Sequence, residues 1–113
     1  MEIAFVGSTK TVPEPVREVT AAKLSHLGRL APVLERAEVR FTWDPVRPVH
    51  ARNVCEVKMT GHGHTVRARA AGRDEPGSVD LVVAKLEHQV ERLKGRLIAR
   101  SHPRKSHPRP SPG

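Results

Sequence analysis

The first apolar stretches of the chain alternate and then recur at helical spacing. Residues 2–7 alternate apolar side chains between two faces and stop at Gly7, which predicts a short strand. A helix is predicted from Pro13 to just before Pro32, because proline suits a first helical turn, where its missing N–H is no loss. The apolar positions that follow recur every three or four residues, as on one face of a helix: Val16, Thr20, Leu24, Leu27 and Leu30.

Three stretches in the middle of the chain alternate more strictly, which is typical of half-buried strands. They cover residues 35–43, 52–59 and 65–70, and a turn at 60–63 joins the last two into a hairpin. Residues 44–48 contain two prolines and predict a loop, because proline interrupts the ladder of hydrogen bonds. The apolar faces of these strands would carry Ala37, Val39, Phe41, Trp43, Cys55, Val57, Met59, Val66, Ala68 and Ala70.

The clearest helical pattern follows Asp74, a good N-cap, and has Pro76 in its first turn. Its apolar seam consists of Val79, Val82, Val83, Leu86, Val90, Leu93 and Leu97. The order of elements is therefore βαβββα, and we predict an α+β fold in which two helices pack on one face of a four-stranded antiparallel sheet. We expect one domain over residues 1–98 and a disordered, basic, proline-rich tail over 99–113, which has nothing to bury.

Composition limits the classes of function. The chain has 113 residues, is 37% hydrophobic and has a formal net charge of +8. Its single cysteine, Cys55, excludes an internal disulfide and a cysteine-based zinc site. No apolar run approaches the ~20 residues of a membrane span and no secretory signal is visible, so we expect a cytoplasmic protein. Much of the excess positive charge lies in residues 94–113. Binding of a polyanion by the predicted domain would therefore depend on how the domain's own charges are segregated.

Catalytic and metal-binding patterns are absent from the sequence. It contains no Ser/His/Asp arrangement, no paired-carboxylate site and no glycine-rich phosphate loop, so we expect neither an enzyme nor a cofactor. His62 and His64 lack a third ligand, so no metal site is expected. Cys55 falls on an apolar strand face, which favours an inert buried thiol. Trp43 ends a strand beside a proline loop, where a place at the edge of the core is favoured over a base-stacking platform.

Charges are segregated around the second predicted helix. At about 100° per residue, one face carries a row of four side chains, which we call the basic stripe: Lys85, His88, Arg92 and Arg96. Another face carries Asp80, Glu87 and Glu91. Like charges four residues apart on a helix repel, so the segregation needs a reason. Phosphate binding is one such reason, and a solvated face with accidental segregation is the alternative.

Further basic residues lie outside this helix. The first predicted helix adds Lys23, His26 and Arg29. Lys23 falls within the apolar arc, so its aliphatic stem would lie along the core while the ammonium reaches solvent. Arg67 and Arg69 share the polar face of a strand, where they would either bind phosphate or keep an exposed sheet soluble. For each of these residues, a surface charge without a role is the alternative.

Both predicted helices resemble those of a known family. The second contains Lys85-Leu86-Glu87-His88-Gln89, preceded by Asp74 and by Val79-Asp80. This pattern resembles the second helix of the ribosome hibernation factors, the family of hibernation-promoting factor and ribosome-associated inhibitor A (protein Y). The first contains Val16-Arg17 followed by Lys23-Leu24, which resembles the family's first helix. The resemblance extends over nearly all of the predicted domain.

The resemblance implies a factor that binds the small ribosomal subunit between its head and body, at the decoding region. There it would overlap mRNA and tRNA and inhibit translation in idle or stressed cells. It also implies that rRNA phosphates contact six side chains on the two helices: Lys23, His26, Arg29, Lys85, His88 and Arg92. The runner-up interpretation is a general double-stranded RNA-binding or other non-ribosomal interaction module, because small α+β folds with basic helices also serve there.

The chain departs from the family pattern in three respects. Pro76-Gly77 stands where the family usually has an aromatic and a small residue, which predicts a later helix start. His26 and His88 stand where the family is often charged, so phosphate binding is expected to be weaker or to depend on pH. We also expect no C-terminal dimerisation domain in this chain, whose last residues form the predicted tail.

Overall fold

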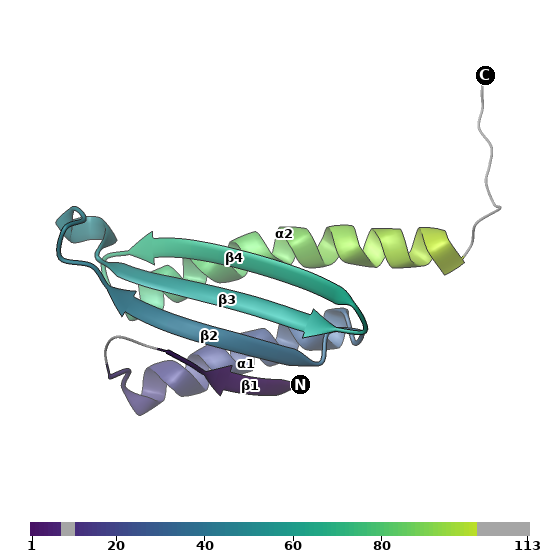
Figure 1. The fold of residues 1–113 in the computed structure, drawn as a ribbon, viewed down its shortest axis with the longest axis horizontal. Coiled ribbons are helices and arrows are strands. Elements are labelled where there is room, and N and C mark those ends of the chain that lie inside the picture. Colours follow the sequence, from purple (N-terminus) through teal and green to yellow (C-terminus); the bar gives the residue numbers. More distant parts are fainter. Residues whose placement is uncertain (8–10, 102–113) are drawn as a thin grey trace, which may run out of the picture.

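The computed structural model describes residues 1–7 and 11–101, and it shows a sheet with both helices on one of its faces (Figure 1). The elements in chain order are β1 (Glu2–Phe5), α1 (Glu14–Leu30), β2 (Arg36–Trp43), the short 3-10 helix η1 (Val49–Ala51), β3 (Asn53–Gly61), β4 (His64–Gly72) and α2 (Glu75–Ser101). This order confirms the predicted βαβββα arrangement and the α+β class. α2 continues past residue 98, where we predict the tail to begin, and the rest of the predicted tail lies outside the described residues.

The four strands lie side by side in the order β1-β2-β3-β4. β2, β3 and β4 pair antiparallel as predicted, with His62 and Gly63 as the two-residue turn between β3 and β4. Both turn residues have positive φ, 51° and 80°, as a tight hairpin turn requires. The prediction of a fully antiparallel sheet is wrong for β1, which runs parallel to β2. The reason is α1, which returns the chain to the end of the sheet where β1 started, so that β2 runs in the same direction.

The core lies between the sheet and the helices, because each strand turns its apolar residues toward them. Val39, Val57 and Ala68 lie opposite one another on neighbouring strands, and all three are buried. The helices contribute a second buried set, which includes Leu24, Leu27, Val79, Val82, Leu86, Val90 and Leu93. Two residues of the predicted apolar faces are exposed at the ends of their elements: Trp43, for which the edge of the core is predicted, is 48% exposed where β2 ends, and Leu30 is 38% exposed in the last turn of α1.

The start of α2 shows how its cap works. The Asp74 carboxylate accepts a hydrogen bond from the Gly77 N–H at 2.8 Å, which confirms Asp74 as the N-cap. α2 begins at Glu75, so the later start expected from Pro76-Gly77 is wrong. The first turn accommodates the proline because that position needs no N–H donor.

Among the residues that the structure describes, no helix has both the length and the apolar character that a membrane span requires.

Truncation of Leu86 tests this packing. Leu86 is fully buried in the seam between α2 and the sheet. Leu86→Ala should lower the free energy of unfolding by about 2–5 kcal/mol, because it removes apolar contact and leaves a cavity. Denaturant unfolding followed by circular dichroism measures the loss. A change below about 0.5 kcal/mol, the size typical of a surface substitution, would show that Leu86 is not buried between α2 and the sheet.

Candidate nucleic-acid interface

Lys85, the first residue of the basic stripe on α2, lies at the outer edge of β4. Lys85 is exposed, and its Nζ donates a hydrogen bond to the carbonyl oxygen of Arg69 at 2.8 Å. Arg92 is exposed two turns further along the same helical face. Since the partner of Lys85 is a neutral carbonyl group, the hydrogen bond orients the ammonium without neutralising its charge. In the described part of the chain, no ion pair joins a carboxylate to Lys85 or Arg92.

Gln89 fixes the position of α2 against the same strand. Its side-chain oxygen accepts a hydrogen bond from the backbone N–H of Arg67 at 3.0 Å, and its side-chain nitrogen donates to the carbonyl oxygen of Arg67. β4 is an edge strand, so these backbone groups have no neighbouring strand to pair with. The Gln89 amide takes the place of that strand. This role could not be predicted, because in the sequence Gln89 is only the last residue of the Lys85–Gln89 motif and a polar residue beside the apolar seam.

His88 has a different set of neighbours, which includes acidic side chains. It is exposed and lines a shallow hollow between the helices, together with Leu30 of α1 and two carboxylates of α2, Glu87 and Glu91. The structure therefore places this member of the basic stripe beside acidic side chains. A phosphate bound at His88 would have to approach these two carboxylates as well.

The predicted residues of α1 point in different directions. Lys23 is partly exposed and forms an ion pair with Asp80 of α2, with 3.6 Å between its Nζ and the carboxylate oxygen. Its ammonium thus joins the two helices, although a surface pair of this kind contributes only about 0–1 kcal/mol. Arg29 lines a hollow with Met1 at the β1 side of α1, and His26 is exposed. The six predicted residues all belong to the helical layer, but the structure does not gather them into one cluster.

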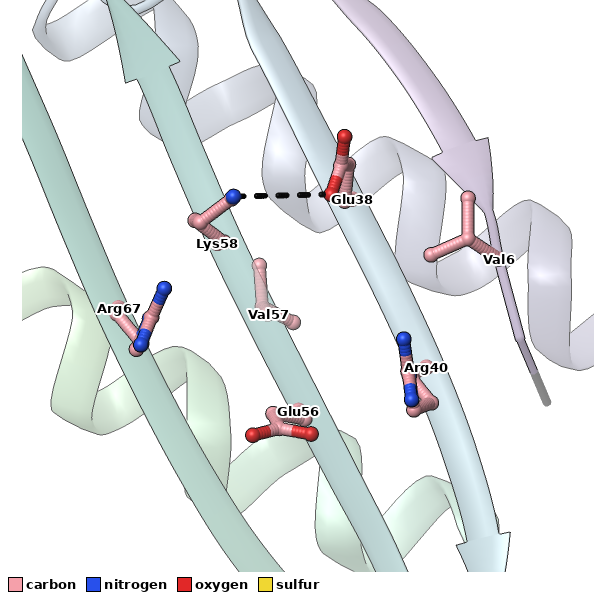
Figure 2. Close-up of a pocket in the computed structure, with 7 residues that line it drawn as sticks. All are labelled: Val6, Glu38, Arg40, Glu56, Val57, Lys58 and Arg67. Atoms are coloured by element: carbon pink, nitrogen blue, oxygen red, sulfur yellow. Dashed lines mark ion pairs between the residues drawn. The ribbon is translucent and has the colours of Figure 1, made fainter. Parts of the chain in front are cut away.

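The opposite face of the sheet is not covered by a helix, and it carries charges of both signs (Figure 1; Figure 2). A hollow of about 260 Å³ on this face has a mixed lining, in which Arg40, Lys58 and Arg67 alternate with Glu38 and Glu56. Lys58 pairs with Glu38 at 3.9 Å, as Figure 2 shows. This interleaving is typical of a solvated sheet face, on which cross-strand pairs of opposite charge are mildly stabilising.

The same pattern of ion pairs continues toward β1. Arg36 pairs with Glu2 at 3.0 Å and with Glu38 at 3.3 Å. Hydrogen bonds to these two carboxylates, that of Glu2 above all, raise the pKa of the Arg36 guanidinium. The Arg36 guanidinium therefore already has two carboxylate partners within the sheet.

Cys55 is a free, buried thiol, and His62 has a carboxylate neighbour. Burial raises the pKa of the Cys55 thiol to about 12, so it stays protonated at neutral pH and is a poor nucleophile. His62 lies 3.0 Å from the Glu35 carboxylate, measured from its Nε2. Among the described residues, no group of three or more histidine, cysteine, aspartate or glutamate side chains is placed to hold a metal ion.

Comparison with known proteins gives a family and a relative. The family model described as Sigma 54 modulation protein / S30EA ribosomal protein matches residues 3–98. The ribosome hibernation promotion factor of Deinococcus radiodurans is 31% identical over 106 residues, which cover 94% of this chain and 56% of that protein. The chain therefore spans about half the length of this curated relative.

Two solved structures share the fold. A ribosomal subunit interface protein from Coxiella burnetii is similar with a TM-score of 0.66 and 21% identity, over 83% of this chain and 96% of that one. The N-terminal domain of protein Y from Thermus thermophilus is similar with a TM-score of 0.67 and 24% identity, over 82% of this chain and 99% of that one. Both similarities cover most of this chain, so they support the fold described above.

Proposed function

We propose that this chain, which belongs to the family described as Sigma 54 modulation protein / S30EA ribosomal protein, is a ribosome hibernation factor. In this proposal it binds the small ribosomal subunit at the decoding region, excludes mRNA and tRNA, and thereby inhibits translation in idle or stressed cells. The mechanism is occlusion by shape and by phosphate contacts, so no bond is made or broken and no cofactor is needed. Such a factor would act in the cytoplasm.

The observation that carries the proposal is the orientation of Lys85 and Arg92 along the edge of β4. Lys85 is held by a neutral carbonyl group and Arg92 stands on the same exposed face, so both keep their charge for an external anion. Phosphate contacts from such side chains supply most of the sequence-independent affinity for RNA and fix the orientation of a protein on it. The D. radiodurans relative, named as a ribosome hibernation promotion factor, supports the ribosome as the source of that RNA.

The remaining predicted residues contribute unequally in this proposal. Lys23 is shared with Asp80, and His88 stands beside Glu87 and Glu91, so neither offers a free positive charge comparable to that of Arg92. Arg29 and His26 are exposed on α1, Arg29 at its β1 side, and they would meet RNA only where it wraps across both helices. We therefore expect α2 to provide the main anchor and α1 to provide weaker contacts.

Sedimentation of a cell lysate through a sucrose gradient tests the proposal against the alternative of a general RNA-binding module. We expect the protein to sediment with small subunits or with monosomes. Sedimentation with free RNA alone, and no binding to purified small subunits, would contradict the ribosomal function and favour the alternative.

Removal of residues 102–113 separates the contribution of the described residues from that of the C-terminal segment. This segment carries basic residues and lies outside the described part of the structure. Its deletion should weaken small-subunit binding modestly and reduce its salt dependence, because such charges add attraction without specificity. Binding to purified small subunits at physiological salt is the measurement. A complete loss of binding would show that this segment, and not the helices, is the anchor.

A further inference from the structure

Three basic side chains from three different elements line one hollow where β4, α2 and the connection between β2 and β3 meet. They are Arg47 of the connection, Arg69 of β4 and Lys85 of α2, and the hollow between them has a volume of about 320 Å³. The remaining lining comes from Val54, Ala70 and Ala71, which are uncharged. We call this feature the three-cation hollow. Figure 1 shows the corresponding place in the fold, where η1 lies against the end of β4 near the start of α2.

The position of Arg47 is set by hydrogen bonds within its own connection. The Arg52 side chain donates from Nε to the carbonyl oxygen of Arg47 at 2.9 Å. Asp44 closes the turn, since its carboxylate accepts a hydrogen bond from the N–H of Val46 at 3.0 Å and its N–H donates to the carbonyl oxygen of Arg52 at 2.8 Å. Arg47 is only partly exposed. The loop therefore fixes the backbone of Arg47, and its side chain lines the hollow together with residues of β4.

Lys85 enters the hollow along the opposite wall. Its hydrogen bond to the carbonyl oxygen of Arg69 fixes the ammonium next to the strand that also carries the Arg69 side chain. The Lys85 ammonium is thus positioned by a contact to a backbone carbonyl group, which leaves its charge uncompensated, while the hydrogen bonds of the loop position the backbone of Arg47. Like charges gathered in this way repel one another, and an anion between them would remove the repulsion.

The hollow on the uncovered face of the sheet provides an internal comparison. It also contains three basic side chains, but Glu38 and Glu56 stand among them. The three-cation hollow has no carboxylate in its lining. The three-cation hollow therefore presents three uncompensated positive charges in its lining, whereas the two carboxylates of the other hollow leave it with an excess of one. Two guanidinium groups with planar donor forks and one ammonium are the donor set that phosphate oxygens prefer.

We propose that the three-cation hollow binds a phosphate group. This inference rests on the proposed function in that the expected source of the phosphate is the backbone of RNA, while a free phosphate compound offers the same chemistry. It extends the contact surface beyond the six predicted residues, because Arg47 and Arg69 belong to the sheet and its connection. Lys85 would serve both surfaces, as the point where the basic stripe meets the hollow.

A pair of double variants tests the site. Arg47→Gln/Arg69→Gln removes two charges from the hollow, and Arg17→Gln/Arg40→Gln removes two exposed charges elsewhere as a matched control. Binding to purified small subunits is measured over a range of salt concentrations, after circular dichroism has shown that both variants are folded. The hollow variant should bind about tenfold more weakly and with a shallower salt dependence, because it loses phosphate contacts and the counterions that they release. The control should change by less than about twofold.

Titration of the isolated protein with inorganic pyrophosphate identifies the source of the phosphate. Weakened subunit binding without saturable pyrophosphate binding by the wild type supports the site and assigns it to the RNA backbone. Saturable pyrophosphate binding that the hollow variant loses while it keeps subunit binding supports the site and assigns it to a free phosphate compound. Two double variants that match in both measurements would overturn the proposal. A wild-type protein that fails to bind small subunits would overturn the proposed function, and the pyrophosphate titration would still decide whether the hollow binds phosphate.

Discussion

Charge reversal at Lys85 and Arg92 should abolish binding to the small subunit and leave the protein folded. The double variant Lys85→Glu/Arg92→Glu places carboxylates where phosphates would lie. It also extends the acidic set of Glu87 and Glu91 around the helix, so that the exposed side of α2 would repel RNA as a whole. Both substituted positions are exposed, and the hydrogen bond from Lys85 to Arg69 is worth only about 1 kcal/mol, so the fold should survive.

Three measurements and one control variant make this prediction specific. Circular dichroism should show an unchanged fold, sedimentation should show no association with purified small subunits, and a cell-free system should translate at its uninhibited rate. Arg17→Glu/Arg73→Glu changes the net charge by the same amount at two exposed positions away from the basic stripe, and it should retain most of the inhibition. A folded Lys85→Glu/Arg92→Glu variant that inhibits translation at the wild-type concentration would rule out the helix as the anchor.

Most of the fold could be predicted because each element buries a single face. In β2, β3 and β4, a shift of one residue would turn the whole apolar set toward solvent, so the alternation sets both the strands and their facing sides. The parallel pairing of β1 could not be predicted in this way. Its four residues alternate equally well in either direction, and only the path of α1 across the sheet decides which one is used.

The part of the candidate site that lies within a single helix could be predicted from the sequence. The faces of α2 follow from its period alone, and the structure keeps Lys85 and Arg92 on the exposed side. The pairing of Lys23 with Asp80 depends on how α1 lies beside α2, which no pattern within one helix contains. The same holds for the contact between Gln89 and Arg67, which joins residues of two elements distant in sequence.

The exposure of apolar side chains at the ends of helices and strands could not be predicted either. Trp43 and Leu30 continue the apolar patterns of their elements, yet both lie where the opposing layer no longer covers them. A periodic pattern predicts which way a side chain points, while its burial depends on whether another element reaches that far. The three-cation hollow illustrates the same limit for charges, because the basic residues that line it come from three separate segments.

Gly61 is subject to a packing constraint that the sequence does not reveal, and its substitution is expected to have the largest effect on stability. In the sequence it belongs to an ordinary turn at residues 60–63. In the structure it ends β3, and the connection from α1 to β2 passes directly over it. A side-chain carbon at this position would lie 2.0 Å from the carbonyl oxygen of Val33 and 2.7 Å from the backbone nitrogen of Glu35. The same nitrogen donates a hydrogen bond to the carbonyl oxygen of Thr60 at 2.8 Å, which ties the connection to β3.

Gly61→Ala should therefore lower the free energy of unfolding by about 4 kcal/mol or more, because backbone atoms on both sides would have to separate and break the ladder at this end of the sheet. Gly95→Ala is the matched control, since Gly95 is an exposed position of α2 where an added methyl group meets no atom within 4 Å. The control should stabilise the protein by about 0.5–1 kcal/mol through the higher helix propensity of alanine. Denaturant unfolding of both variants measures the contrast in sign. Equal stabilities for Gly61→Ala and the wild type would mean that the connection does not pack on β3, and that the end of the sheet beneath α1 is more open than the structure shows.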